Sequence, residues 1–94
     1  MFQLHIEHPV PHYDNWKKAF DSDPVNRKNM GVHNFRILRS IENPNYVTIE
    51  LDFETAIQAE ALLNAMRAVW KNVEGKIMMN PQVRISEIVQ ESTI

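Results

Sequence analysis

Three observations predict an α+β fold for this chain of 94 residues. Four segments alternate apolar with polar residues, as half-buried strands do. Two others carry apolar residues at the helical period of about 3.6 residues. Their order along the chain is β-α-β-β-α-β, and no linker or low-complexity tract interrupts it. We therefore expect one ferredoxin-like domain over residues 1–94, with a four-stranded antiparallel sheet and two helices on one of its faces.

The first strand is predicted from Phe2 to His8, where apolar and polar side chains alternate. Pro9 and Pro11 end it, because proline cannot donate a ladder hydrogen bond and disfavours helix in the residue before it. A helix follows and ends near Asp21 to Pro24. Its buried face carries Tyr13, Trp16, Ala19 and Phe20. Residues 22–32 then form a long, turn-rich connection.

The second and third strands are predicted to form a hairpin around the turn Glu42-Asn43-Pro44-Asn45. The second begins near His33, and the third runs from Tyr46 to Phe53 with alternate residues apolar. We expect the first and third strands to be adjacent and parallel at the centre of the sheet. The face without helices then displays five polar side chains, those of Gln3, His5, Glu7, Thr48 and Glu50.

The second helix is predicted to begin at Thr55, because Thr55 and Gln58 have the spacing of a capping box. Apolar residues continue at the helical period as far as Val73, and Gly75 supplies a left-handed stop. A fourth strand follows Pro81 and contains Val83, Ile85, Ile88 and Val89.

Composition excludes several classes of function. Twelve acidic against ten basic residues give a net charge of -2, so the chain offers no field that would draw in nucleic acid. The absence of cysteine excludes disulfides, thiolate metal sites and cysteine nucleophiles. No Gly-rich phosphate loop, His-Glu-x-x-His helix or serine nucleophile elbow is present. With no signal peptide and no stretch near the roughly 20 apolar residues of a membrane span, we expect a cytoplasmic protein that does not interact with membranes.

Four motifs carry a resemblance to a known family. They are Tyr13-Asp14-x-Trp16-x-x-x-Phe20, Asp23-Pro24-Val25-x-Arg27, Phe35-Arg36-Ile37-Leu38-Arg39 and Asn43-Pro44-Asn45-Tyr46-Val47. In them the chain resembles the dimeric α/β-barrel superfamily and, more narrowly, small relatives of the antibiotic-biosynthesis monooxygenase (ABM-like) domain. The resemblance implies a homodimer in which two sheets pair face to face and enclose a barrel. A domain this small would also gain buried surface from a partner.

The resemblance does not select a reaction, because the superfamily includes cofactor-independent oxygenases, haem-degrading oxygenases, lactone isomerases, polyketide cyclases and proteins with no known activity. Haem-degrading relatives usually place the iron-ligating histidine on the second helix. Residues 54–73 contain no histidine, so we expect no haem and no other cofactor. Close relatives usually have an aspartate where this chain has His12, which leaves open whether His12 or Asp14 caps the first helix.

The candidate site lies at the junction of the first strand and first helix. His8 falls on the same strand face as Leu4 and Ile6, and we expect it near Tyr13 and Trp16. It is either a buried histidine hydrogen-bonded to its surroundings or a general base or substrate anchor. His33 is the second candidate for proton transfer, with Arg36 stabilising an enolate-like charge.

An aromatic or polyketide-like small molecule would suit a pocket between helices and sheet. Its predicted binding residues are Tyr13, Trp16, Phe20 and Arg27. The aromatic residues are equally explained by core packing, and the arginines by solvent exposure or ion pairing. The leading hypothesis is a monooxygenase-like or cyclase- or isomerase-like enzyme.

Two alternatives to an enzyme remain open at this stage. The chain is a noncatalytic homodimeric ligand-binding or interaction module, or it is a metal protein that uses His5, Glu7 and Glu50. Imidazole and carboxylate ligands suit iron, zinc or manganese, and alternate residues of a strand share a face.

Overall fold

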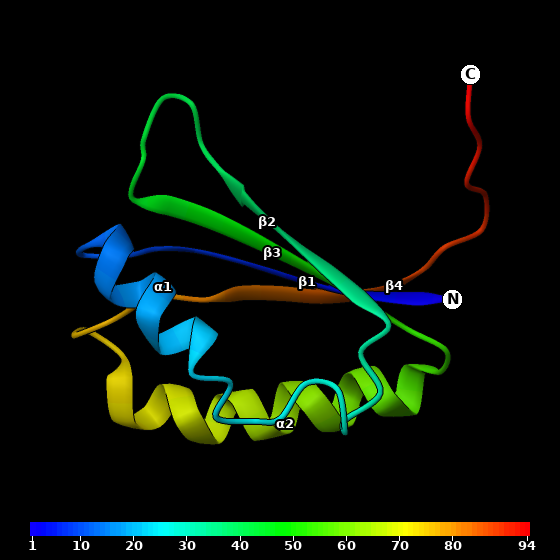
Figure 1. The fold of residues 1–94 in the computed structure, drawn as a ribbon, viewed down its shortest axis with the longest axis horizontal. Coiled ribbons are helices and arrows are strands. Elements are labelled where there is room, and N and C mark those ends of the chain that lie inside the picture. Colours follow the sequence, from blue (N-terminus) through cyan, green and yellow to red (C-terminus); the bar gives the residue numbers. More distant parts are fainter.

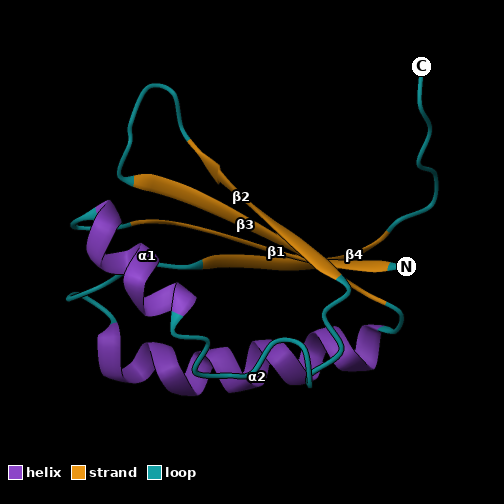
Figure 2. Ribbon diagram, in the orientation of Figure 1, coloured by secondary structure: helices purple, strands orange, loops and turns teal.

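The computed structural model describes all 94 residues. A four-stranded sheet carries two helices on one face, and the opposite face has none (Figures 1 and 2). In chain order the elements are β1 (Phe2–Pro9), α1 (Tyr13–Asp21), β2 (Asn34–Arg39), β3 (Tyr46–Phe53), α2 (Ala56–Val73) and β4 (Gln82–Glu87). The predicted ferredoxin-like fold and its element order are confirmed. No helix combines the length and apolar character needed to cross a membrane.

The strands are ordered β2-β3-β1-β4, and every neighbouring pair is antiparallel. The prediction that the first and third strands are parallel is therefore wrong, although they are adjacent. The hairpin reverses the chain between β2 and β3, whereas α1 returns it so that β2 runs in the same direction as β1. Since β3 lies between them, it opposes both.

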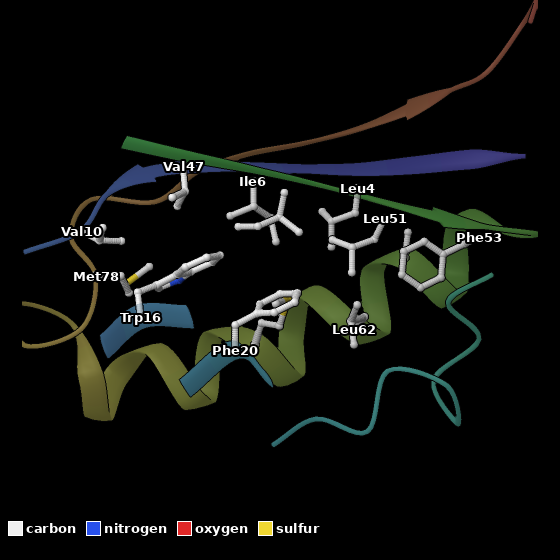
Figure 3. Close-up of a cluster of buried hydrophobic side chains, with 13 residues drawn as sticks. Leu4, Ile6, Val10, Trp16, Phe20, Val47, Leu51, Phe53, Leu62 and Met78 are labelled. Carbon is white, nitrogen blue, oxygen red and sulfur yellow. The ribbon is translucent and has the colours of Figure 1, made fainter. Parts of the chain in front are cut away.

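The core lies between the sheet and the helices, where thirteen buried apolar residues form one cluster (Figure 3). Leu4 and Ile6 of β1 project toward Leu62 of α2, beside alternate residues of β3. Each of these three side chains has no exposed surface. Burial of this apolar face fixes the register of the two central strands, because a slip by one residue would turn it to solvent.

The backbone of α1 lies farther from the sheet than that of α2 does. None of its Cα atoms lies within 8 Å of a Cα atom in the sheet or in α2. Its contact with the core is made by the long aromatic side chains of Trp16 and Phe20, which are 5% and 7% exposed. Their rings stack, with centroids 5.3 Å apart. Helix and sheet are thus separated by side chains large enough to leave a space between them.

The structure settles how both helices begin. The predicted capping box is formed, since Thr55 accepts the Gln58 backbone N–H and the Gln58 side chain accepts that of Thr55. Neither candidate residue caps α1 in this way: His12 holds the N-cap position without a side-chain bond. Instead Asn45 Oδ1, from the β2–β3 turn, accepts the Tyr13 N–H at 3.3 Å.

α2 ends at Val73, as predicted, whereas the end of the fourth strand differs from the prediction. Gly75 directly follows the C-cap residue Glu74 and has the expected positive φ of 85°, although its N–H donates to the Met78 carbonyl oxygen rather than to a carbonyl of α2. β4 ends at Glu87, so Ile88 and Val89 lie outside it. The C-terminal residues extend away from the sheet (Figure 1).

Candidate functional site

A cavity of about 250 Å³ occupies the space between α1, the C-terminal half of α2 and the sheet. Fifteen residues line it, and eleven of them are hydrophobic. Trp16 and Phe20 contribute aromatic surface from α1, and Trp70 does so from α2. Such a wall favours a largely apolar, flat ligand, and the few polar groups among the lining residues then decide what chemistry is available.

His8 is one of these polar groups. It is the penultimate residue of β1 and points toward the helices, as predicted, with 1% of its surface exposed. Its ring meets the Trp16 ring edge to face, with centroids 5.9 Å apart. Nδ1 lies 3.1 Å from the carbonyl oxygen of Pro9. A carbonyl oxygen only accepts, so Nδ1 carries the proton and Nε2 of the neutral ring has the lone pair.

The lone pair of Nε2 is available to the cavity. No protein group hydrogen-bonds to this atom, and the protein contains no fully buried side-chain nitrogen or oxygen without a partner. Nε2 therefore retains contact with the cavity space. Burial lowers the pKa of His8 below its ordinary value, and the bond to Pro9 opposes this only in part. The ring is thus neutral at pH 7 and acts as an acceptor of protons or hydrogen bonds.

Arg27 is the cation of the cavity wall. Its guanidinium carbon lies 3.9 Å from the centroid of the Phe20 ring, and Nη1 donates to the Phe20 carbonyl oxygen at 2.9 Å. Asp23 accepts the Arg27 backbone N–H at 3.0 Å. These contacts fix the guanidinium while leaving it further N–H groups for an anionic or carbonyl oxygen of a ligand.

Four of the seven predicted site residues line the cavity: His8, Trp16, Phe20 and Arg27. Tyr13 lies behind Trp16, at 5.9 Å between ring centroids, with Arg39 stacked on it. His33 lies in a separate cleft. The structure thus places neither Tyr13 nor His33 in the lining of the cavity that contains His8.

Arg36 is also misplaced by the prediction, because it belongs to the face of the sheet without helices. It pairs in register with Glu50, and its guanidinium binds the Glu50 carboxylate at 2.9 Å. Side chains alternate between the two faces along a strand, so Arg36 cannot reach the cavity that His8 lines.

The helix-free face carries a polar network. His5 Nε2 lies 2.7 Å from Glu7 and its Nδ1 lies 3.9 Å from Glu50. The Tyr46 hydroxyl donates to Glu7 at 2.9 Å. The hydrogen bonds from His5 and Tyr46 lower the pKa of Glu7, and the bond to Glu7 raises that of Tyr46. Across the sheet, Arg36, Glu50, His5 and Arg84 form one row.

This network does not have the arrangement of a metal site. No three His, Asp or Glu side chains gather into a group that could hold a metal ion. His5 instead uses one ring nitrogen on Glu7, which itself accepts from Tyr46. The geometry is that of mutually satisfied hydrogen bonds on a sheet surface.

Sequence reasoning missed part of the cavity wall. Met66, Val69 and Val73 carried the helical period of α2, which indicates burial without distinguishing core from pocket. Ile77 and Met78 follow α2 in an irregular turn. No sequence pattern indicates that this turn folds back against His8 and Trp16.

Comparison with known proteins gives matches among solved structures only. No family model and no curated protein matches the chain, whereas 36 solved chains do. A protein from Bordetella bronchiseptica, proposed to be an antibiotic biosynthesis monooxygenase, is 22% identical over 95% of this chain and 97% of its own, with a TM-score of 0.70. The haem degrader MhuD of Mycobacterium tuberculosis, solved with two haems in its active site, is 18% identical over 97% and 99%, also at 0.70. A dimeric ferredoxin-like protein from an uncultured marine organism is 8% identical over the whole of both chains, again at 0.70.

These matches establish the fold. The chain has the ferredoxin-like architecture that ABM-like proteins share, and it does so over nearly its full length. The predicted resemblance to ABM-like proteins is confirmed for the fold. The fold is one that monooxygenase-type and small-molecule-binding proteins use, and a reaction has to be argued from the side chains of the site.

Proposed function

We propose that the cavity binds a small, flat, largely apolar organic molecule and that His8 exchanges a proton with it. The observation that carries this proposal is a neutral, buried imidazole with its Nε2 lone pair available to an otherwise apolar cavity. Aromatic or polyketide-like molecules combine a flat ring system with acidic O–H or C–H groups. Such a ligand matches both the aromatic wall and the base.

The chemistry follows from His8 and Arg27, since the remaining polar side chain of the lining, Ser22, donates its hydroxyl to the Ala19 carbonyl oxygen. Nε2 accepts a proton from an enol, a phenol or an activated C–H group, which gives an imidazolium and an oxyanion or enolate on the ligand. The Arg27 guanidinium is the group of the cavity wall that can stabilise that negative charge. The low pKa of His8 favours return of the proton, as isomerisation or cyclisation requires. A monooxygenase-like enzyme would instead react the electron-rich anion with oxygen.

A substrate panel tests this proposal. Trp16 and Trp70 are the only two tryptophans and both line the cavity, so intrinsic fluorescence reports its occupancy. Hydroquinones and polyketide-like phenols that quench this fluorescence are then incubated in air, and products are followed by mass spectrometry. His8→Gln should lower turnover by about 10²- to 10⁴-fold with little change in binding. His12→Gln, at an exposed position, should leave turnover unchanged. Turnover that survives His8→Gln would refute the assignment of the base.

A binding protein without catalysis is the second candidate. The observation in its favour is that a single histidine reaches the cavity, with no second side chain placed as a general acid. In that case ligands would quench the tryptophans without being converted, and His8→Gln would change affinity alone.

We also propose that two copies pair through their helix-free sheet faces. In support, this face is uncovered in one chain (Figure 1), and its cross-strand row carries both acidic and basic groups, with Glu50 between Arg36 and His5. The structurally similar marine protein is described as dimeric. Pairing in this way would leave both cavities on the outer, helical side of the assembly.

A further inference from the structure

The loop between α1 and β2 (residues 22–33) forms a second, more open cleft next to the cavity. Its lining differs in character, since two of its seven residues are hydrophobic. Arg27, Lys28 and His33 contribute the basic groups, and Phe35 forms an aromatic edge. Neither the fold nor the proposed proton transfer requires such a cleft.

The cleft has a defined shape, because contacts at the C-terminal end of the loop hold the loop in place. Gly31 has a φ of +93°, and a Cβ atom there would lie 2.8 Å from Gln58 Nε2, so the loop fits closely over the start of α2. Beyond it the His33 N–H donates to the Asp52 carbonyl oxygen at 2.9 Å. The basic groups are thereby set at a defined place beside the sheet.

Arg27 connects the two spaces, as it is the one residue that lines both. Its guanidinium carbon lies 3.9 Å from the Phe20 ring centroid and 4.9 Å from that of Phe35. The Phe20 ring faces the cavity and the Phe35 ring faces the cleft. A ligand that extends past Arg27 would therefore pass from an apolar space into a basic one.

The charge balance of the cleft favours an anion. The Asp23 carboxylate lies 3.5 Å from Arg27 Nε and offsets that cation. Asn34 donates to the Asp52 carboxylate at 3.0 Å. Lys28 makes no ion pair or side-chain hydrogen bond within the protein, and neither does the imidazole of His33. The cleft thus has one cation without an acidic partner and a free imidazole, and it lies beside a cavity whose wall is largely apolar.

We propose that this cleft binds the carboxylate end of the same ligand whose flat body occupies the cavity. The ligand class is an aromatic acid with a short spacer between its rings and its carboxylate. Lys28 and His33 contact the carboxylate, and Arg27 lies at the border between the two binding regions. This inference rests on the proposed function, because it assumes that the ring system lies against Trp16 and Trp70.

Two probes that differ only at the end group test the inference. 3-(9-Anthryl)propionate and 3-(9-anthryl)propanol share the ring and spacer, and anthracene absorbs where tryptophan emits, so energy transfer from Trp16 and Trp70 reports binding of either. At low ionic strength the acid should bind about fivefold more tightly than the alcohol, as expected of one exposed ion pair. High salt should abolish the difference.

Variants locate the carboxylate. In the double variant Lys28→Gln, His33→Gln the preference should fall below about twofold while the alcohol binds as before, which also shows that the variant is folded. Lys18→Gln removes the same charge from α1 outside both spaces and should keep the full preference. Equal binding of acid and alcohol to the unaltered protein, or a preference that survives the double variant, would overturn this inference alone. Binding of neither probe would refute occupancy of the cavity by aromatic rings, and the inference with it.

Discussion

Two histidines of β1 show how the surroundings of a residue decide its chemistry. His5 and His8 are both buried, at 8% and 1% exposure, yet they lie on opposite faces of the sheet. His5 is hydrogen-bonded to Glu7, so its ring is part of a polar network. His8 meets an indole ring and one backbone carbonyl, and its second nitrogen is left to the cavity. His8 thus combines a lowered pKa with access to the cavity.

The lowered pKa of His8 predicts a pH-dependent stability. In the unfolded chain the imidazole titrates near 6.5, and in the folded protein it titrates lower. Below pH 6.5 the unfolded state therefore binds more protons, so this contribution to stability is fully present above 6.5 and is lost as the pH falls toward the folded pKa. In urea unfolding, His8→Gln should lose less stability than the unaltered protein between pH 7.5 and pH 5.5.

His12→Gln is the matched control, because His12 is exposed and should leave the slope with pH unchanged. An identical loss of stability in the His8→Gln and unaltered proteins would contradict burial of a neutral ring at this position.

At the scale of elements, the cavity exists because α1 is spaced from the sheet by aromatic side chains. α2 packs closely and supplies the floor of the core through small and aliphatic residues such as Ala59 and Leu62. The two amphipathic helices on one sheet face thus have different roles: α2 packs closely to form the core, and α1 leaves space for the cavity. The loop from α1 to β2 and the turn after α2 close the remaining sides.

The start of α2 provides a test of local stabilisation. Thr55→Ala removes the side-chain oxygen that accepts the Gln58 N–H at 3.1 Å, and it should lower the free energy of unfolding by about 1 kcal/mol. Thr55→Ser keeps the hydroxyl and should lose much less. Equal losses in the two variants, measured by chemical denaturation, would show that the capping box does not stabilise the helix.

The loop between α1 and β2 depends on Gly31. Gly31→Ala places a methyl group against Gln58 at a positive φ of 93°, so we expect a loss of at least about 1 kcal/mol in unfolding free energy. Gly75→Ala, also at positive φ but with open space around it, provides the comparison. A loss no greater at Gly31 than at Gly75 would mean that the loop does not need its close fit to α2.

For the whole molecule, the contrast between the two sheet faces indicates where a partner subunit can bind. One face is largely apolar and covered by helices, whereas the other carries ionisable groups joined by hydrogen bonds and has Leu38 at 44% exposure beside them. A partner of complementary charge can cover such a face without leaving its polar groups unpaired. A second copy offers the same row of acidic and basic groups.

Sedimentation measures the proposed dimer directly. At micromolar concentration we expect a species of twice the 11.0 kDa chain mass. Leu38→Arg adds a charge to the helix-free face and should weaken self-association at least about tenfold. Ile57→Arg makes the same change at a residue of α2 that is 77% exposed and should have no effect. A single 11.0 kDa species in the unaltered protein would contradict the pairing.

The sequence by itself determined the element order, the capping box at Thr55 and the side of β1 on which His8 lies. These follow from local rules, namely the period of apolar residues, proline chemistry and the spacing of a hydroxyl and an amide. It also placed Trp16 and Phe20 on the inner face of α1. It could not distinguish a filled core from a cavity, because the same apolar pattern produces both.

Only the tertiary structure decided which groups meet. Strand pairing placed Arg36 with Glu50 on the helix-free face, and the path of the loop carried His33 into a separate cleft. The spacing of α1 from the sheet left room for a ligand. Contacts between distant segments depend on register and side-chain volume across the whole domain, which no local pattern contains. The backbone carbonyl of Pro9, which no sequence motif indicates, binds Nδ1 of His8 and so leaves the lone pair on Nε2.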